Sequence, residues 1–147
     1  MTIRISSGLR AALLSDYGLS AMMAYGVIDV YSGTQPESAS QAPTGVLLGT
    51  VTQDGLPFQP NTTIGGLQIG LSEGGGLGLV GVWRLKGVAA GTAGWWRWRW
   101  NSPDDNQDSF YYPRVDGSYG ESLLLASSAI TPATDVVISE FYVNFME

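Results

Sequence analysis

The chain has 147 residues, no cysteine, no histidine, 14% charged residues and a formal net charge of −6. This composition excludes a disulfide framework, removes the side chain most often used as a general base or metal ligand at neutral pH, and argues against general nucleic-acid binding. The length predicts a single domain over residues 1–147, and the shortage of charge predicts that other chains cover part of the surface.

The first 26 residues predict the one good helix of the chain. It begins near Gly8, where Ser6 or Ser7 can cap it. Its apolar residues recur at helical spacing and are Leu9, Ala12, Leu13 and Tyr17. A further turn over 21–25 ends at Gly26. We expect this helical segment to lie across an open end of a sheet or to clamp a neighbouring subunit. It lacks the pattern of a signal peptide, and no run reaches the ~20 apolar residues of a membrane helix.

Residues 27–147 predict short strands separated by turns. The expected strands are Val27–Tyr31, Val46–Thr52, Ile64–Leu71, Leu77–Lys86, Trp95–Trp100, Phe110–Val115, Glu121–Ala126 and Asp135–Phe145. In the last of them, strict alternation places Phe141 and Val143 on one face with Val137 and Ser139. This spacing favours an all-β fold, an antiparallel β-sandwich of the jelly-roll type that follows the N-terminal helix.

The segment from Trp95 to Trp100 holds four of the five tryptophans. A strand places Trp96, Trp98 and Trp100 on one face and the side chains of residues 95, 97 and 99 on the other. We expect the three-indole face to fill the core. The alternatives are a subunit interface and a platform on which sugars stack, together with Tyr111 and Tyr112.

A locally basic segment surrounds this strand, because no acidic residue lies between Glu73 and Asp104. The candidate residues for a protein interface are Trp83, Arg84, Lys86, Trp95, Arg97 and Arg99. Such a patch suits an acidic protein partner. In the alternative, Arg97 and Arg99 pair with nearby carboxylates or stack on an indole. On the interface hypothesis, truncating both arginines weakens assembly, whereas Trp98→Ala damages folding.

The acidic stretch over residues 104–108 partly matches a calcium-binding loop. Asp104, Asn106 and Asp108 occupy alternating ligand positions, but Ser109 stands at the turn position and Val115 where a glutamate ligand is required. We therefore expect a solvated turn. The sequence assigns no catalytic residue, no metal ligand and no cofactor, and we expect no enzymatic activity.

Several short motifs follow one another in a characteristic order. They are Arg4–Arg10, Ile28–Gly33 with Pro36 after it, Thr44–Leu48, a segment around Trp83, Gly91–Arg97, Arg114–Gly117 and a closing β-strand. In this order they resemble a family of small structural proteins of tailed bacteriophages, which includes jelly-roll capsid decoration, or cement, proteins. The chain departs from that family in its tryptophans, because the Gly-Thr-Ala segment more often leads into phenylalanine.

The resemblance implies a structural role on the outside of the phage head, where the protein would brace capsomers. The implied partners are the major capsid protein and further copies of the chain, as a dimer or trimer, with no nucleic acid, membrane or cofactor. The chain would be made in the host bacterial cytoplasm and end in the virion. Two other hypotheses stay open: a place in the phage tail, neck or baseplate, and a carbohydrate-binding module.

Overall fold

A computed structural model describes residues 3–9, 18–71 and 76–144. The strands in chain order are β1 Arg4–Ile5, β2 Val27–Tyr31, β3 Leu47–Gln53, β4 Ile69–Leu71, β5 Leu77–Leu79, β6 Trp83–Gly87, β7 Gly91–Thr92, β8 Trp95–Arg99, β9 Arg114–Ser118, β10 Leu123–Leu125, β11 Ala129–Ile130 and β12 Asp135–Val143. Every strand pairing is antiparallel. The expectation of a mostly β, antiparallel fold is therefore confirmed.

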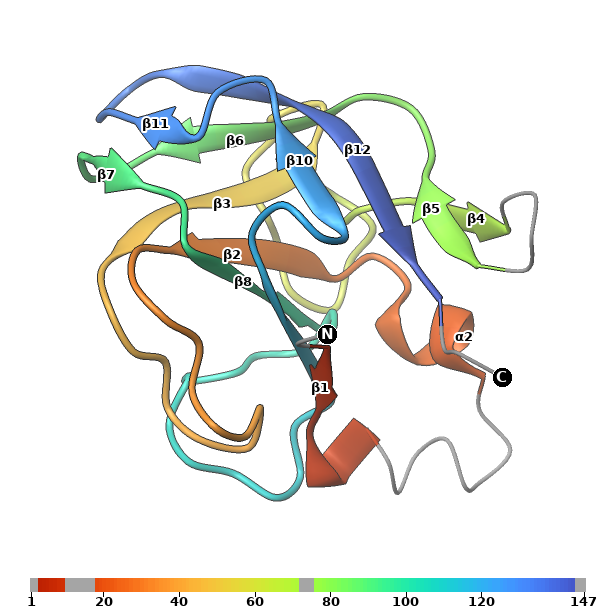
Figure 1. Ribbon diagram of the computed structural model, residues 1–147. Coiled ribbons are helices and arrows are strands. Elements are labelled where there is room, and N and C mark those ends of the chain that lie inside the picture. The colour runs from red at the N-terminus through yellow and green to blue at the C-terminus, as the bar shows by residue number, and fades with distance from the viewer. Residues whose placement is uncertain (1–2, 10–17, 72–75, 145–147) are drawn as a thin grey trace.

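The sheet is strongly curled (Figure 1). Its order is β1-β9-β8-β2-β3-β6-β12-β5-β4, with β10 also paired to β12, and β7 and β11 form a small second sheet. β12 pairs with β6 at its start, with β10 in its middle and with β5 at its end. The curl brings β12 across from β8, so the described strands form an open half-barrel rather than two clearly separate layers.

The N-terminal region differs from the predicted single helix. It opens with β1, which pairs Arg4 with Asp116 of β9, and a helical turn follows at 7–9. The remainder of the expected helix, over 10–17, lies outside the described residues. The short helix α2, Leu19–Met23, buries Met23 and ends where Tyr25 adopts a positive φ of 58°. In the part of the chain that the structure describes, no helix is long and apolar enough to cross a membrane.

A β-bulge in β12 corrects the face assignment of the last strand. Leu124 pairs with Glu140 whereas Leu125 pairs with Ile138, so one residue of β12 is unpaired between them. The extra residue flips the alternation. Ile138 and Phe141 therefore both point into the core, although simple alternation puts them on opposite faces.

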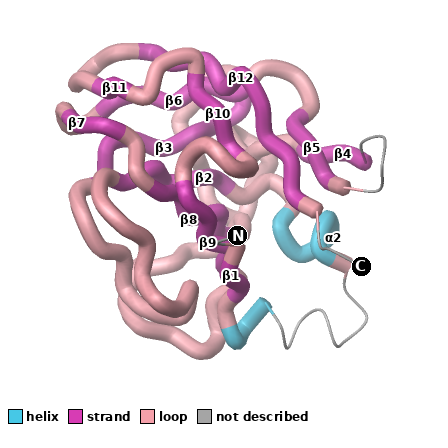
Figure 2. The backbone as a smooth tube through the Cα atoms, viewed as in Figure 1, coloured by secondary structure: helices cyan, strands magenta, loops and turns pink. Residues whose placement is uncertain are grey.

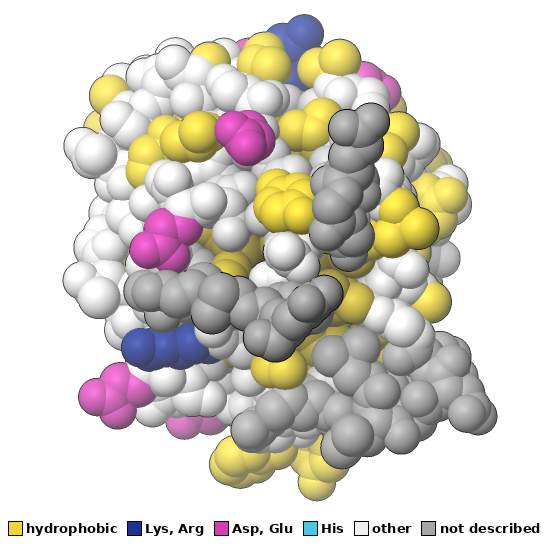
Figure 3. All heavy atoms as spheres, turned by 45° about the vertical axis from the view of Figure 1, so that its right-hand side comes forward, with side chains coloured by type: hydrophobic (Ala, Val, Ile, Leu, Met, Phe, Trp, Pro, Cys, Tyr) yellow, Lys and Arg dark blue, Asp and Glu magenta, His cyan; other side chains and the backbone are white. Residues whose placement is uncertain are grey.

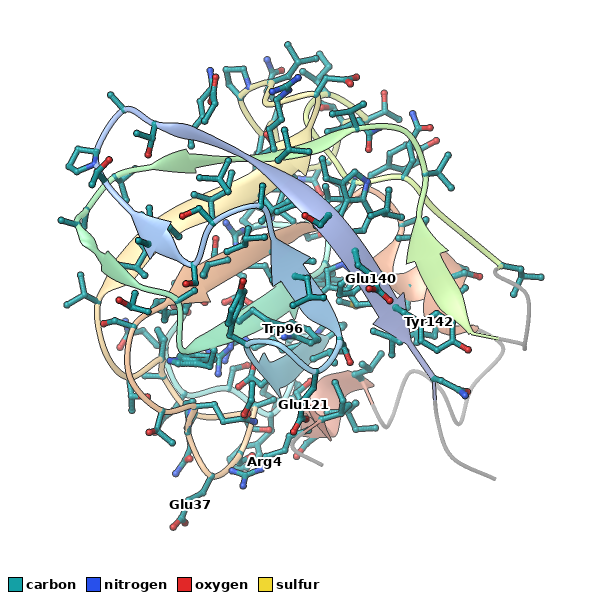
Figure 4. The ribbon with its side chains drawn as sticks, turned by 45° about the horizontal axis from the view of Figure 1, so that its top comes forward. Arg4, Glu37, Trp96, Glu121, Glu140 and Tyr142 are labelled. Atoms are coloured by element: carbon teal, nitrogen blue, oxygen red, sulfur yellow. The ribbon has the colours of Figure 1, made fainter. Side chains whose placement is uncertain are left out.

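The core is built around the ring of Phe141. The rings of Trp83, Trp96 and Trp98 lie 5.1, 5.6 and 5.6 Å from it, centroid to centroid. Edge-on and tilted contacts of this kind are favourable geometries for aromatic pairs. Figure 4 shows Trp96 inside the curl between β8 and β12.

Gly117 lies opposite Trp96 on β9, and a Cβ there would stand 2.3 Å from Cζ2 of the indole. The glycine therefore makes room for the ring.

Candidate functional site

The other face of the sheet carries a row of charged side chains that runs from β12 to β1. Successive strands place these residues directly opposite one another: Asp135, Lys86, Thr50, Asp29, Arg97, Asp116 and Arg4. We call this set the charged row. Each strand contributes one residue, and the charges of the ionisable residues alternate in sign along the row. The uncharged Thr50 stands between Lys86 and Asp29. Cross-strand neighbours of opposite charge stabilise a sheet.

The middle of the charged row is a buried ion pair. Arg97 and Asp116 are both 0% exposed, and their side chains form two parallel hydrogen bonds, Nε to Oδ1 at 2.8 Å and Nη2 to Oδ2 at 2.9 Å. Arg97 also donates to the carbonyl oxygen of Gln41 and lies over the Trp95 ring. Burial raises the pKa of the Asp116 carboxyl, and its bond to Arg97 opposes that shift. The two-pronged geometry fixes the guanidinium between loop and sheet.

A second ion pair lies beside the first. Arg99 donates from Nε to Asp29 Oδ2 at 2.7 Å, and the hydroxyl of Thr50 donates to Asp29 Oδ1 at 2.7 Å. The guanidinium lies over the ring of Phe58, 5.4 Å from its centroid. The side chain of Arg99 is 15% exposed, so this pair meets solvent on one side.

The first residue of the acidic stretch at 104–108 forms a third ion pair. A solvated turn is expected there from the sequence. The side chain of Asp104 is 0% exposed and binds Arg114 through both carboxylate oxygens, with Nε donating at 2.8 Å. The expectation of a solvated turn is therefore wrong for Asp104. Within residues 3–9, 18–71 and 76–144, no group of three or more acidic side chains could hold a metal ion.

Two long loops seal this face over β8 and β9. They cover residues 32–46 and 100–113 and run next to each other in Figure 2. Ser109 donates its backbone N–H to the carbonyl of Ser40, and Ala42 donates to the carboxylate of Asp108. Beneath them Trp95 stacks on Tyr31, with ring centroids 4.5 Å apart, and donates from Nε1 to the carbonyl of Thr44. The two loops thus cover the face of β8 and β9 that points away from the aromatic core.

The six candidate interface residues differ in their exposure and in their ion pairs. Trp83, Trp95 and Arg97 are 0% exposed, so they have no surface to offer a partner, and the interface hypothesis is wrong for them. The alternative holds for Arg97 and Arg99, which pair with carboxylates. Arg84 and Lys86 lie at alternate positions of β6. Arg84 is half-buried and Lys86 is exposed, and neither forms an ion pair with a described residue.

Lys86 and Arg99 meet at a groove on the open side of the sheet. Its hollow is about 320 Å³, and it is lined by Thr50, Thr52, Gly55, Leu56, Pro57, Phe58, Lys86, Val88 and Arg99. The stem of Lys86 runs toward Gly55, where a Cβ would lie 3.6 Å from Lys86 Cε. We call this the basic groove. It combines an apolar wall with two cationic groups, which suits a ligand that carries a carboxylate beside an apolar group.

The expected core face is confirmed for two of its three indoles. Trp96 and Trp98 are 0% exposed, whereas Trp100 lies at the edge of the core and faces Tyr112 at 6.4 Å between ring centroids. A sugar needs an open indole face to stack on. The platform of Trp96, Trp98 and Trp100 is therefore not formed.

The acidic partners of the arginines were missed by sequence reasoning. Asp29 stands alone in Val-Ile-Asp-Val-Tyr, and Asp116 stands alone in Arg-Val-Asp-Gly. For Asp29, a lone carboxylate within an otherwise apolar strand is a signal for a buried partner, since an unpaired buried charge is costly. Asp116 gives no such signal, because its strand also contains Arg114 and Ser118. Each partner lies far along the chain, which is why the sequence did not identify the pairs.

Tyr31 gives a testable pH dependence. Burial, and then the charge of Asp29, raise the pKa of its phenol above the usual value of about 10. The unfolded chain therefore loses this proton first, and stability should fall as pH rises past about 10, by up to ~1.4 kcal/mol per pH unit from this group. We expect Tyr31→Phe to flatten the fall in urea midpoint between pH 9 and pH 11.

Tyr111→Phe is the matched control for this experiment, because the side chain of Tyr111 is 85% exposed. It should leave the alkaline fall unchanged. An alkaline fall that is as steep in Tyr31→Phe as in the unaltered chain would contradict the burial of the Tyr31 hydroxyl.

Comparison with known proteins adds no relative to this picture. No protein-family model matches the chain, and neither the curated proteins nor the solved structures contain a match.

Proposed function

We propose that this protein is a structural virion protein of a tailed bacteriophage, a cement protein that binds the outside of the head and stabilises contacts between capsomers. The resemblance of its ordered motifs to phage structural proteins supports this proposal. The jelly-roll arrangement belongs to the same proposal, and the curl that places β12 opposite β8 is compatible with it.

The observation that carries the proposal is a surface rich in apolar side chains and poor in charge. Three of the seven basic residues are held in ion pairs with carboxylates that are at most 3% exposed. The exposed large apolar residues are Tyr25, Val46, Leu47, Leu56, Ile64, Leu71, Val80, Val82, Val88, Phe110, Tyr111, Leu124 and Val137. Figure 3 shows one face on which such side chains alternate with uncharged polar ones and charges are few. A surface with so few charges is sparsely protected against association, which favours a protein that is covered by partners.

The mechanism of such a protein is mechanical. Arg97 and Arg114 tie the two loops to the outer face of the sheet, through Gln41 and Asp104, and the aromatic cluster around Phe141 ties the inner face to β12. Each copy is then a stiff unit, and it loses little conformational freedom when it binds. Many modest contacts, repeated by the symmetry of the shell, would raise its resistance to internal pressure.

Counting and locating the copies in purified virions tests this proposal. A cement protein is expected on the head surface at on the order of hundreds of copies, because it repeats with the capsomers. About a dozen copies, or density at the tail, neck or baseplate, would replace the cement role by the other phage position. Absence of the chain from the particle would overturn a virion role altogether.

A further inference from the structure

The basic groove and one exposed loop of the same chain have complementary surfaces. We propose that the basic groove of one copy receives the loop 105–111 of a second copy. This inference rests on the self-association included in the proposed function, and it names the two surfaces that make the contact.

The groove offers positive charge that the chain itself leaves uncompensated. Lys86 is exposed and forms no ion pair with a described residue, although Asp135 is its neighbour on β12. Arg84 lies two residues away on the same face of β6 and likewise has no ion pair there. Arg99 adds a partly exposed guanidinium that Asp29 balances. A carboxylate that enters the groove would therefore meet Lys86 first.

The groove also offers an apolar wall next to that charge. Leu56 and Val88 are 51% and 62% exposed, and the ring of Phe58 is half-buried under Arg99. Large apolar side chains so exposed beside a hollow of about 320 Å³ favour a ligand with an aromatic or aliphatic group. The preferred occupant carries negative charge and a large apolar side chain close together.

The loop 105–111 has this composition. Asp105 and Asp108 are exposed, and Phe110 and Tyr111 follow them at 73% and 85% exposure. The loop is ordered before it binds, because Asp104 is fixed by Arg114 and the backbone of Ser109 is fixed to Ser40. A preordered loop with two open aromatic rings pays a small entropic cost on association.

The two surfaces lie on different parts of the molecule. In Figure 1 the loop, in cyan, is at the lower left, whereas β6, which carries Lys86, is at the top. One copy cannot therefore fill its own groove with its own loop. A contact between unlike surfaces can be made twice, reciprocally, in a two-fold dimer, or it can repeat from copy to copy in a closed ring or an open chain.

Mixing two defective variants tests the proposal in solution. Lys86→Glu damages only the groove, and Phe110→Ser combined with Tyr111→Ser damages only the loop. We expect each variant to self-associate about tenfold or more weakly than the unaltered chain, because charge reversal and loss of aromatic anchors act at the contact. Mixed one to one, they should form a capped heterodimer by analytical ultracentrifugation, since one intact groove and one intact loop remain.

Leu71→Ser is the matched control, because Leu71 is also 85% exposed but lies on β4, away from both surfaces. It should associate as the unaltered chain does. Far-UV circular dichroism should match for all variants, because every substituted side chain is exposed. Urea midpoints should match as well, except for a small fall in Lys86→Glu, whose carboxylate would face Asp135 across the sheet.

Chemical cross-linking identifies the contact directly, because Lys86 is the sole lysine of the chain. A carbodiimide joins a lysine amine to a carboxylate in direct contact. In a mixture of ¹⁴N- and ¹⁵N-labelled chains, we expect a mixed-isotope link from Lys86 to Asp105 or Asp108. Links between copies that join Lys86 only to other carboxylates would overturn the choice of this loop.

A chain that remains monomeric up to its solubility limit, or two variants that fail to associate when mixed, would also overturn the inference. These results are separate from the location of the protein in the virion. If the protein lies on the head surface but does not make this contact, the proposed function stands and the inference fails. If the contact forms but the protein is absent from virions, the inference stands and the proposed function fails.

Discussion

Replacing Arg97 with alanine is expected to reduce the free energy of unfolding by about 3–5 kcal/mol, although arginine is usually a surface residue. The variant leaves the carboxylate of Asp116 0% exposed without its two-pronged partner. It also removes the donor to the carbonyl of Gln41 and the cation over the Trp95 ring. A domain of this size is typically stable by 5–15 kcal/mol, so urea unfolding should show the loss plainly.

Two further variants separate the buried charge from simple loss of packing. Arg97→Met combined with Asp116→Leu removes both charges and should recover stability to within about 1–2 kcal/mol of the unaltered chain. Arg84 on β6 is half-buried and forms no ion pair with a described residue, so Arg84→Ala should change stability by only about 0.5 kcal/mol. If Arg97→Ala is as mild as Arg84→Ala, the pair is not buried as described.

From the sequence alone, truncating Arg97 together with Arg99 is expected to weaken assembly. The structure instead predicts that loss of Arg97 weakens folding. Alternation correctly divides β8 into two faces, with Trp96 and Trp98 in the core. It does not show what lies over the second face. The cover consists of loops rather than strands, and loops have no hydrophobic period, so nothing in the sequence marks them as the other half of the packing.

Strand bounds are predicted correctly where the strand has an apolar face and is followed by a clear turn. The expected strand Val27–Tyr31 has the same bounds as β2, and Val46–Thr52 is within one residue of β3. The expected strand Phe110–Val115 begins only at Arg114, directly after Pro113, which has no backbone N–H to donate to a neighbouring strand. The glycine-rich segment Ile64–Leu71 forms a strand only at Ile69–Leu71, since glycine weakens strands.

The charged row explains why strands with little polar patterning find one register. Asp29 on β2 is opposite Arg97 on β8, and Arg97 is opposite Asp116 on β9. Slipping β8 by one residue would place Trp96 or Trp98 between the two carboxylates and would turn Arg97 toward the core. Both carboxylates would then be buried without a cationic partner, at a cost of several kcal/mol. The ion pairs therefore contribute to specificity as well as to the attachment of the loops.

Replacing Trp98 with alanine is expected to cost about 3–5 kcal/mol as well, for a different reason. The indole is 0% exposed and meets Phe141 edge-on, so truncation leaves a cavity between β8 and β12, the two strands that the curl brings together. Urea unfolding followed by far-UV circular dichroism measures the loss, since tryptophan fluorescence is itself altered. A loss below about 1 kcal/mol would contradict the burial of this ring.

Phenylalanine at two neighbouring core positions provides the matched comparison. Trp98 Nε1 is buried without a hydrogen-bond partner among the described residues, whereas Trp96 Nε1 donates to the carbonyl of Ser118 at 3.1 Å. Both substitutions remove the same volume, but only Trp96→Phe deletes a hydrogen bond. We expect Trp96→Phe to cost at least about 1 kcal/mol more than Trp98→Phe, because a buried donor without a partner lowers stability and its removal recovers part of that cost. The reverse order would show that the Trp98 indole N–H is satisfied in solution, and the aromatic cluster would then contain a polar contact that its packing does not explain.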